Sequence, residues 1–394
     1  MIEWSDKHLM TTAKRYPIAL VRGEGARVWD SEGKEYLDFT GGIAVTALGH
    51  SHPKVVGTMR EQAATLLHVS NLFHIPQQVQ LAKLLCEHSF AERVFFSNSG
   101  AEANETAIKL ARKCAKERGA SDRGDIISMR GGFHGRTLAT VTATAQEKYH
   151  HGYEPLPGGF KYVPFNDLRA VERSIDSRTA AVLVEPIQGE GGINIPDDSY
   201  LPGLRKLCDE TGVLLVFDEI QTGMGRTGKL WCYEHAGVTP DIMTLAKALA
   251  NGVPIGATLA TEEVAQVFTP GSHGSTFGGN PFATAVGLTV FTTLVEERLP
   301  ERAERMGRLL RERLLAVRSR HPGPVKEVRG RGLLVGMDLA TPVGDAVSAC
   351  RERGLLVLTA GDNTLRLAPP LIVDEAAVER AAEIIERALG AAHA

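Results

Sequence analysis

Between about residues 90 and 260, short apolar runs alternate with stretches of helical periodicity, and this alternation is the strongest constraint on the fold. The apolar runs are RVFFSN, DIISMR, AAVLVEP, VLLVFDE and DIMTLAK. Their cores are apolar on both faces, as expected for strands covered by helices on each side of a sheet. The pattern therefore predicts an α/β fold with a mostly parallel central sheet.

The segments on either side of this region predict a second, smaller unit. Residues 26–40 read as a hairpin, and Pro53 opens an amphipathic helix to about Leu67. Residues 284–320 read as one or two helices, followed by short β-rich runs and a last helix from about Asp374. The expected division is an N-terminal segment packing with the small domain (1–50), a large domain (51–285) and a C-terminal α+β domain (286–394).

Composition excludes several classes of protein. The 394 residues are 43% hydrophobic and 23% charged with a net charge of -3, which fits a globular enzyme and favours neither nucleic acid nor an anionic membrane as partner. The five cysteines form no C-x-x-C pair, and the N-terminus lacks an apolar signal region. We therefore expect a cytoplasmic protein with free thiols and no metal site.

The hexapeptide Gly223–Gly228 matches G-x-G-x-x-G, which raises the alternative of a dehydrogenase that binds NADH. In such enzymes the first glycine ends the strand and the third lies in the opening helix. Here Asp218 ends the apolar run five residues before Gly223, and KLWCYEHAGVTPD is too short and broken for that helix. We expect the glycines to shape a turn near the active site and a dimer contact, without binding a cofactor phosphate.

Residues that follow the predicted strands are candidates for a binding site, because ligands gather at the carboxyl ends of strands in such sheets. After RVFFSN, Ser99 and Glu102 fit a capping box that leaves the N–H groups of Gly100 and Ala101 free for a phosphate. The alternative is an ordinary capped helix. After DIISMR, Phe133 could face a ring; the alternative is a simple turn.

Charged residues after the other strands leave further alternatives open. Arg136 could bind a carboxylate or lie on the surface, and Glu185 with Glu190 could be a hydrolase pair or a scaffold residue and a loop residue. Asp218 and Lys247 each end an apolar run. A charged side chain is costly to bury in such a place unless it has a partner or a function. Lys247 could be a nucleophile with a lowered pKa or simply extend toward solvent.

Taken together, these groups match the needs of pyridoxal phosphate. A helix N-terminus suits its phosphate, an aromatic residue its ring, an aspartate its pyridine nitrogen and a buried lysine its aldehyde. The chain also resembles the class III aminotransferases of fold type I along nearly its whole length. The resemblance rests on six motifs in order: SNSGAEANETAIKLAR, GGFHGRT, EPIQGEGG, FDEIQTGMGRTG, LAKALANGVPIGA and HGSTFGGNP.

The resemblance implies the cofactor-binding residues. Lys247 would bond the cofactor and move a proton between the substrate Cα and the cofactor, while Asp218 would pair with the pyridine nitrogen. Thr276 would reach across a homodimer interface to the phosphate of the partner's cofactor. The other residues implied in cofactor binding are Ser99, Gly100 and Ala101 at the phosphate, Phe133 and Ile220 on the two ring faces, and Gln221 near the phenolic oxygen.

The same resemblance implies how substrates bind. Arg366 would hold the α-carboxylate of 2-oxoglutarate or glutamate, and Glu190 would act as a switch that pairs with Arg366 when the amino donor is bound. Arg136 would bind a second carboxylate, and Ser275 would lie beside the substrate across the dimer interface. The intact Lys247 and Arg366 argue against a catalytically silent binding protein.

Within the family, HVSNLFHIPQQVQLAKLL and YPIALVRGEG are most similar to the acetylornithine aminotransferases. Ile43 stands where ornithine aminotransferases usually carry a tyrosine, so the site suits an acylated amine better than a charged one. The expected reaction moves the terminal amino group of N-acetylornithine to 2-oxoglutarate. The alternative donors are 4-aminobutyrate, ornithine, succinyl-diaminopimelate and a carrier-linked lysine. His74 departs from the tyrosine that is common in relatives.

Overall fold

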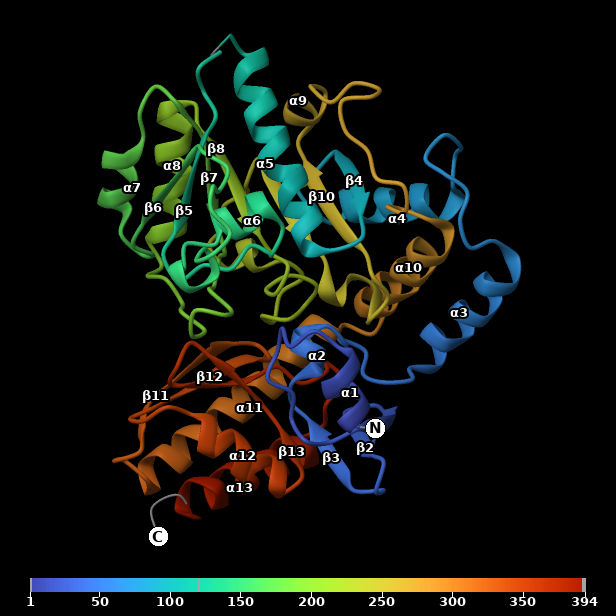
Figure 1. Ribbon diagram of the computed structural model, residues 1–394, viewed down its shortest axis with the longest axis vertical. Coiled ribbons are helices and arrows are strands. Elements are labelled where there is room, and N and C mark those ends of the chain that lie inside the picture. The colour runs from blue at the N-terminus through green and yellow to red at the C-terminus, as the bar shows by residue number, and fades with distance from the viewer. Residues whose placement is uncertain (1, 120, 392–394) are drawn as a thin grey trace.

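Seven strands form the central sheet of the computed structural model, which describes residues 2–119 and 121–391 (Figure 1). Only β10 runs against its neighbours, so the mostly parallel sheet predicted from the sequence is confirmed. The spatial order is β4 (Arg93–Ser97), β10 (Gly256–Ala260), β9 (Ile242–Leu245), β8 (Leu214–Asp218), β7 (Thr179–Val184), β5 (Asp125–Met129) and β6 (Phe160–Val163).

Helices cover both faces of this sheet, which explains why its strands are apolar at successive positions. In β7, Ala181 and Leu183 belong to one buried cluster, whereas Val182 and Val184 belong to another. The first cluster packs under α5 (Gly100–Glu117), and the second under α8 (Tyr200–Thr211) and α10 (Pro281–Glu296). Alternate side chains point to opposite faces of a strand, so both faces of β7 are removed from water.

Two smaller sheets lie below the central sheet in Figure 1, together with three helices. One sheet joins the two ends of the chain, because β13 pairs in parallel with β3 of the N-terminal hairpin. The helices are α11 (Leu299–Arg320), α12 (Gly344–Glu352) and α13 (Glu375–Ala391). The strand orders are β1 (Leu20–Glu24), β2 (Arg27–Asp30), β3 (Glu35–Asp38), β13 (Leu355–Leu356) and β11 (Val325–Arg331), β12 (Leu334–Leu339), β15 (Thr364–Leu367), β14 (Leu358–Ala360).

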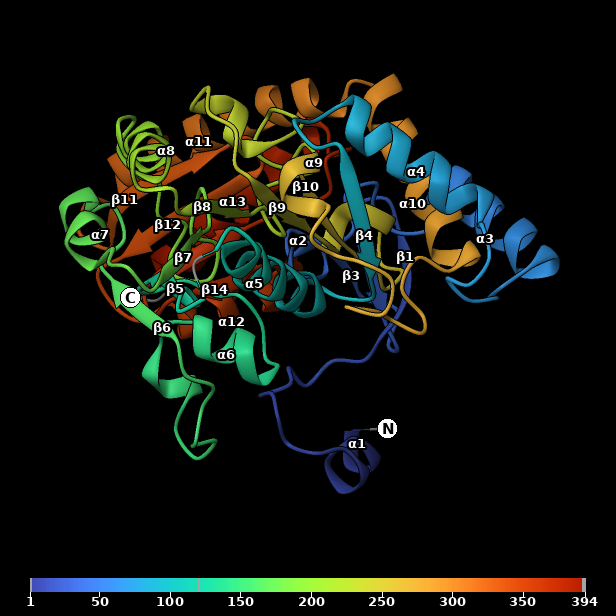
Figure 2. The same ribbon diagram turned by 90° about the horizontal axis from the view of Figure 1, so that it is seen from above.

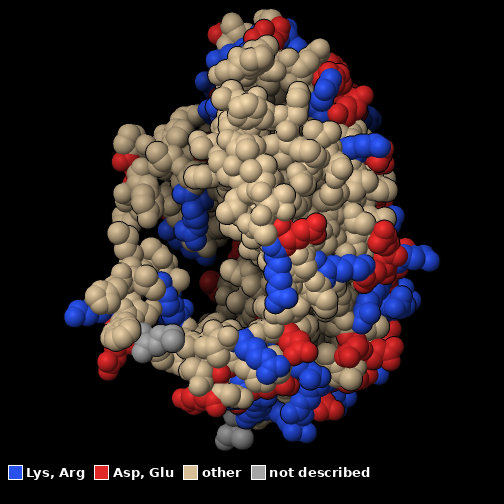
Figure 3. Space-filling view, turned by 90° about the vertical axis from the view of Figure 1, so that its right-hand side faces the viewer, with Lys and Arg blue, Asp and Glu red and all other residues tan. Residues whose placement is uncertain are grey.

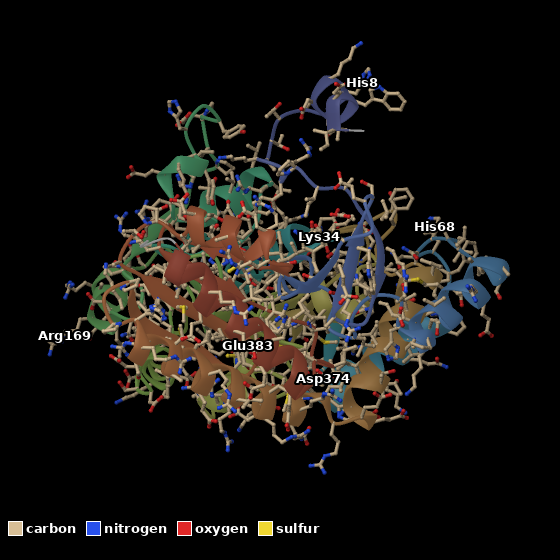
Figure 4. All side chains as sticks on the ribbon, turned by 90° about the horizontal axis from the view of Figure 1, so that it is seen from below. His8, Lys34, His68, Arg169, Asp374 and Glu383 are labelled. Carbon is tan, nitrogen blue, oxygen red and sulfur yellow. The ribbon has the colours of Figure 1, made fainter. Side chains whose placement is uncertain are left out.

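The N-terminal helix α1 (Ile2–His8) stands away from the rest of the molecule (Figure 2). His8 lies far from Glu383 and Asp374, as Figure 4 shows from below. The helices not yet described are α2 (Gly41–Ala44), α3 (Pro53–Thr65), α4 (Pro76–Glu87), α6 (Leu138–Ala143), α7 (Leu168–Ser174), α9 (Glu262–Ala265), η1 (Glu147–Tyr149), η2 (Cys232–His235) and η3 (Lys247–Ala250).

The surface gives two further observations. The side that faces right in Figure 1 is hollowed, and Lys and Arg side chains lie along the wall of the hollow (Figure 3). Across residues 2–119 and 121–391, no helix combines the length and the apolar character needed to span a membrane.

Candidate active site

The residues that follow β4, β5, β7, β8 and β9 meet at one edge of the central sheet. These five strands run in the same direction, since β10 is antiparallel to both β4 and β9. A cavity of about 410 Å³ lies there. Its lining includes most of the residues predicted to bind a cofactor: Ser99, Gly100, Ala101, Phe133, Asp218, Ile220, Gln221 and Lys247, together with Arg136.

The N-terminus of α5 offers free backbone donors to this cavity. Ser99 Oγ accepts the N–H of Glu102 at 3.2 Å, and Glu102 Oε2 accepts the side-chain amide of Asn98 at 2.9 Å. The N–H groups of Gly100 and Ala101 find no acceptor in the part of the chain that the structure describes. Two free donors at the positive end of an 18-residue helix form an anion site.

Asp218 is buried at the end of β8 and is held by three donors. Asn104 Nδ2 donates to Oδ2 at 2.7 Å, His134 Nδ1 lies 2.8 Å from the same oxygen, and the N–H of Ile220 donates to Oδ1 at 3.1 Å. Burial opposes the charge on His134, but the hydrogen bond and the negative charge of Asp218 outweigh it and raise the pKa of His134. The three hydrogen bonds therefore fix the orientation of the aspartate.

Asn104 and His134 were not among the residues predicted from the sequence to form the site. Asn104 had a detectable signal, because it lies on the same face of α5 as the buried Ala107, Ala111 and Cys114. A polar side chain in such an apolar stripe needs a hydrogen-bond partner in the interior. His134 lies in the glycine-rich loop after β5, and nothing in the sequence around it indicates which group it contacts.

Lys247 opens η3 directly after β9 and lines the cavity. Its φ of 44° lies in the left-handed region, which is unfavourable for a residue with a Cβ and typical of functional positions. Burial lowers the pKa of Lys247 to about 8. The amine makes no hydrogen bond within the described residues. At neutral pH a useful fraction of it is uncharged, and the uncharged amine is the nucleophile.

Arg366, which is buried, and Glu190, which is partly exposed, form an ion pair whose charges also act on Lys247. Arg366 Nη1 donates to Glu190 Oε1 at 2.6 Å and to Gln221 Oε1 at 3.3 Å. Gln221 Nε2 donates to the same carboxylate oxygen at 3.1 Å. Burial raises the pKa of Glu190, but the Arg366 guanidinium more than compensates and lowers it. The pair is thus charged, and its arginine can bind another carboxylate if Glu190 moves.

Glu185 has a scaffold role. Its Oε2 accepts the N–H of Phe133 at 2.9 Å, and its Oε1 accepts the N–H of Gly189 at 3.1 Å. Burial raises the pKa of this carboxyl to about 7. Because Glu185 is engaged with two backbone amides and Glu190 with Arg366, the two acids do not form a pair for hydrolysis.

Arg136 lies over aromatic rings at the mouth of the cavity. Its guanidinium carbon is 3.9 Å from the centre of the Tyr149 ring and 5.4 Å from that of Phe133. The two rings meet edge to face at 6.1 Å. This cation–π stacking orients an otherwise exposed guanidinium and leaves its N–H groups available to a ligand. Tyr149 is a further residue to which the sequence analysis assigned no role.

Several predicted residues do not line the cavity: Ile43, Glu190, Arg366, Ser275, Thr276 and the hexapeptide Gly223–Gly228. Ser275 Oγ accepts the side-chain amide of Asn98 at 3.1 Å, and Thr276 is exposed on the same loop. The hexapeptide Gly223–Gly228 is followed by the short η2 rather than by a long helix. It lies away from the helix N-terminus at Gly100, so the dinucleotide alternative finds no support. Among the described residues, no group of three His, Cys, Asp or Glu side chains is placed to hold a metal.

Comparisons with known proteins agree with this geometry. Residues 10–389 match the family model for aminotransferase class-III. The chain is 50% identical to the acetylornithine aminotransferase of Caldanaerobacter subterraneus subsp. tengcongensis, covering 99% of each. Its structure is similar to the crystal structure of ornithine aminotransferase from Toxoplasma gondii (TM-score 0.96, 36% identity, 100% of this chain and 94% of that one). It is also similar to acetylornithine aminotransferase from Elizabethkingia anophelis (TM-score 0.89, 36% identity, 99% and 98%).

Proposed function

Because this chain belongs to the class III aminotransferases, which use pyridoxal phosphate, we propose that it transfers the terminal amino group of N2-acetyl-L-ornithine to 2-oxoglutarate. The products are N-acetylglutamate 5-semialdehyde and L-glutamate. Relatives that carry the name acetylornithine aminotransferase match over nearly the full length of both chains. Within the site, the proposal rests on the Arg366–Glu190 pair, which can expose a carboxylate-binding guanidinium near Lys247.

The residues of the cavity fit pyridoxal phosphate. The free N–H groups of Gly100 and Ala101 suit a phosphate, and the buried Asp218 offers a carboxylate oxygen to a pyridine nitrogen. Lys247 supplies an amine with no other partner in the described residues. The cavity of about 410 Å³ lies within the usual range for small-molecule sites.

When bound, pyridoxal phosphate would supply an electron sink that makes acidic the C–H bond at the substrate carbon that carries the amino group, which is Cδ in N-acetylornithine and Cα in glutamate. We assign the remaining tasks to the protein. Asp218 holds a proton at the pyridine nitrogen, and Asn104 and His134 keep its carboxylate in place. The amine of Lys247 would take the proton from that substrate carbon and deliver it to the aldehyde carbon of the cofactor. Phe133 and Ile220 supply the apolar walls against which the ring packs.

The two substrates require different arrangements around Arg366. We propose that this arginine binds the α-carboxylate of glutamate or 2-oxoglutarate as a bidentate pair, and that Glu190 occupies it when the amino donor is bound. Arg136 holds the second carboxylate of the dicarboxylic acid and the carboxylate of the donor. Ile43 is exposed and does not line the cavity of its own chain. We propose that its apolar side chain suits an acylated amine better than a charged one, which favours N-acetylornithine over ornithine.

The donor can be tested by comparing kcat/KM for N-acetylornithine, ornithine, 4-aminobutyrate and succinyl-diaminopimelate, each with 2-oxoglutarate. We expect N-acetylornithine to exceed ornithine and 4-aminobutyrate by at least about tenfold, because one well-placed polar group discriminates by that factor or more. The measurement is glutamate formation by the purified enzyme. A higher value for 4-aminobutyrate than for N-acetylornithine would show that the assigned donor is wrong.

We also propose that the enzyme acts as a homodimer in which Ser275 and Thr276 reach the partner's active site. The exposure of Thr276, outside the cavity of its own chain, supports this arrangement. Light scattering during gel filtration should give twice the mass of the 42.5 kDa chain. Thr276→Ala should weaken cofactor binding by about tenfold through loss of one hydrogen bond to a charged group, without changing this mass. A fully active monomer would contradict the proposal.

A further inference from the structure

The glycine hexapeptide Gly223–Gly228 does not line the cavity, and its contacts indicate another task. It belongs to the loop that begins after Asp218, and it lies against the turn between β11 and β12. A Cβ added at Gly332 in that turn would overlap the backbone of Thr227 and Gly228. On the other side, a Cβ at Gly307 of α11 would overlap the Gly332 carbonyl. The turn is therefore closely held between the hexapeptide and α11.

Arg226 is the one long polar side chain of the hexapeptide, and it is fully buried. Its Nη1 donates to the carbonyl of Leu333 at 3.1 Å and to the carbonyl of Pro369 at 2.5 Å. The N–H of Leu333 in turn donates to the carbonyl of Arg226 at 3.0 Å. This arginine thus joins the loop after β8 to two separate segments of the C-terminal sheet.

The burial of this guanidinium is unfavourable, which calls for a compensating role. Burial alone lowers the pKa of Arg226 to about 9, and no carboxylate of residues 2–119 or 121–391 pairs with it. Its Nε and Nη2 have no partner among the described residues. An apolar side chain would fill such a position at a lower desolvation cost, so the arginine is better explained by the specific geometry it imposes.

The places of the Leu333 and Pro369 carbonyls show which part of the C-terminal sheet Arg226 holds in position. Leu333 immediately precedes β12, and Pro369 closely follows β15, so both lie at the same end of this antiparallel strand pair. Arg366 is on β15, opposite Gly336 of β12. Arg226 therefore holds the end of the strand pair from which the substrate-binding guanidinium projects.

The same loop also carries residues of the cofactor site. Asp218 stands at its start, and Gln221 accepts a hydrogen bond from Arg366. We propose that Arg226 is a positioning residue that sets the place of Arg366 relative to the cofactor-binding loop, and so tunes binding of the dicarboxylate substrate. This inference rests on the proposed role of Arg366 as the site of the α-carboxylate.

The test compares Arg226→Met and Arg226→Lys with a matched control, Arg302→Met. Arg302 also donates to backbone carbonyls after β15, at Ile372 and Val373, but further from Arg366. We expect Arg226→Met to raise the KM for 2-oxoglutarate by about 10- to 100-fold, since misplacement of a binding group by about 1 Å has effects of this size. Arg226→Lys, which keeps one hydrogen-bonding group, should raise this KM by a smaller factor.

The amino-donor half of the reaction separates positioning from general damage. At saturating N-acetylornithine, its rate should change by less than about threefold in Arg226→Met, because Arg366 is then paired with Glu190. Arg302→Met should leave both measurements near those of the wild type. Equal loss in both half-reactions, or an unchanged KM for 2-oxoglutarate, would overturn the proposal. Failure of both Arg226 variants to fold would overturn it as well, by showing a role in stability alone.

A variant of Arg366 distinguishes this inference from the proposed function. If Arg366→Met raises the KM for 2-oxoglutarate and the Arg226 variants do not, Arg366 keeps its role and the positioning role of Arg226 is refuted. If Arg366→Met has no effect, the proposed function itself is at fault. If Arg366→Met and Arg226→Met each raise the KM for 2-oxoglutarate, the double variant should raise this KM little beyond that of Arg366→Met alone, because the two residues act through one interaction.

Discussion

Replacement of Lys247 by alanine is expected to lower kcat by about 10⁴-fold or more, since this one amine serves as both nucleophile and proton carrier. The residue lines the cavity, carries a strained backbone conformation and has a pKa lowered to about 8 by burial. No other lysine lines the cavity to replace it. The measurement is glutamate formation from N-acetylornithine and 2-oxoglutarate at saturating cofactor.

Borohydride gives this prediction a readout independent of turnover. Reduction should attach the cofactor covalently to the peptide that contains Lys247 in the wild type, and to no peptide in Lys247→Ala. Lys229→Ala is the matched control, because Lys229 is exposed and its amine contacts only the Glu234 carbonyl. Cofactor attached to another lysine in the wild type, or normal turnover by Lys247→Ala, would contradict the assignment.

Asp218→Asn is expected to lower kcat by about 10²- to 10⁴-fold while leaving the fold intact, as for other substitutions that remove one charged member of a catalytic group. Asparagine has nearly the same shape, and its one side-chain oxygen can still accept the hydrogen bond from Asn104, although the bond that Ile220 gives to the other carboxylate oxygen is lost. It has no charge to keep a proton on the pyridine nitrogen, so the electron sink is weakened. The rate of the half-reaction with glutamate measures this effect directly.

Glu219→Gln provides the control for the loss of a buried carboxylate next to the site. Glu219 accepts the N–H groups of Cys232 and Tyr233 at 2.7 and 2.8 Å, and burial raises its pKa to about 8. It does not line the cavity. We therefore expect Glu219→Gln to alter the unfolding temperature more than the half-reaction. An equal loss of rate in both variants would show that Asp218 has no special role.

Much of the scaffold was predictable because its signals are local. The five apolar runs between residues 90 and 260 correspond to strands of the central sheet, and the hairpin at 26–40 and the helix from Pro53 are present as predicted. The capping of α5 by Ser99 was also readable, since it depends on residues three positions apart. In each case the pattern and its structural consequence lie within a few residues of each other.

The contacts that orient the residues of the site were harder to predict from the sequence. Asp218 could be placed at the end of a strand, but its partners Asn104 and His134 are 114 and 84 residues away. The stacking of Arg136 on Tyr149 depends on how the loop after β5 folds back on itself. Several different partners would satisfy the same periodicity and composition, and tertiary packing selects among them.

The sequence alone predicted a mostly parallel sheet that has a helix N-terminus suited to a phosphate, an aspartate and a lysine at its carboxyl edge. These groups meet because parallel strands bring their carboxyl ends to one side of the sheet. Only the tertiary structure placed Gln221 against both Arg366 and Glu190, and joined Arg226 to Pro369 across 143 residues. Hydrophobic periodicity specifies which face of an element is buried, but it does not specify what that face meets. Close packing and the need to satisfy buried polar groups decide that, and they act only once the chain is folded.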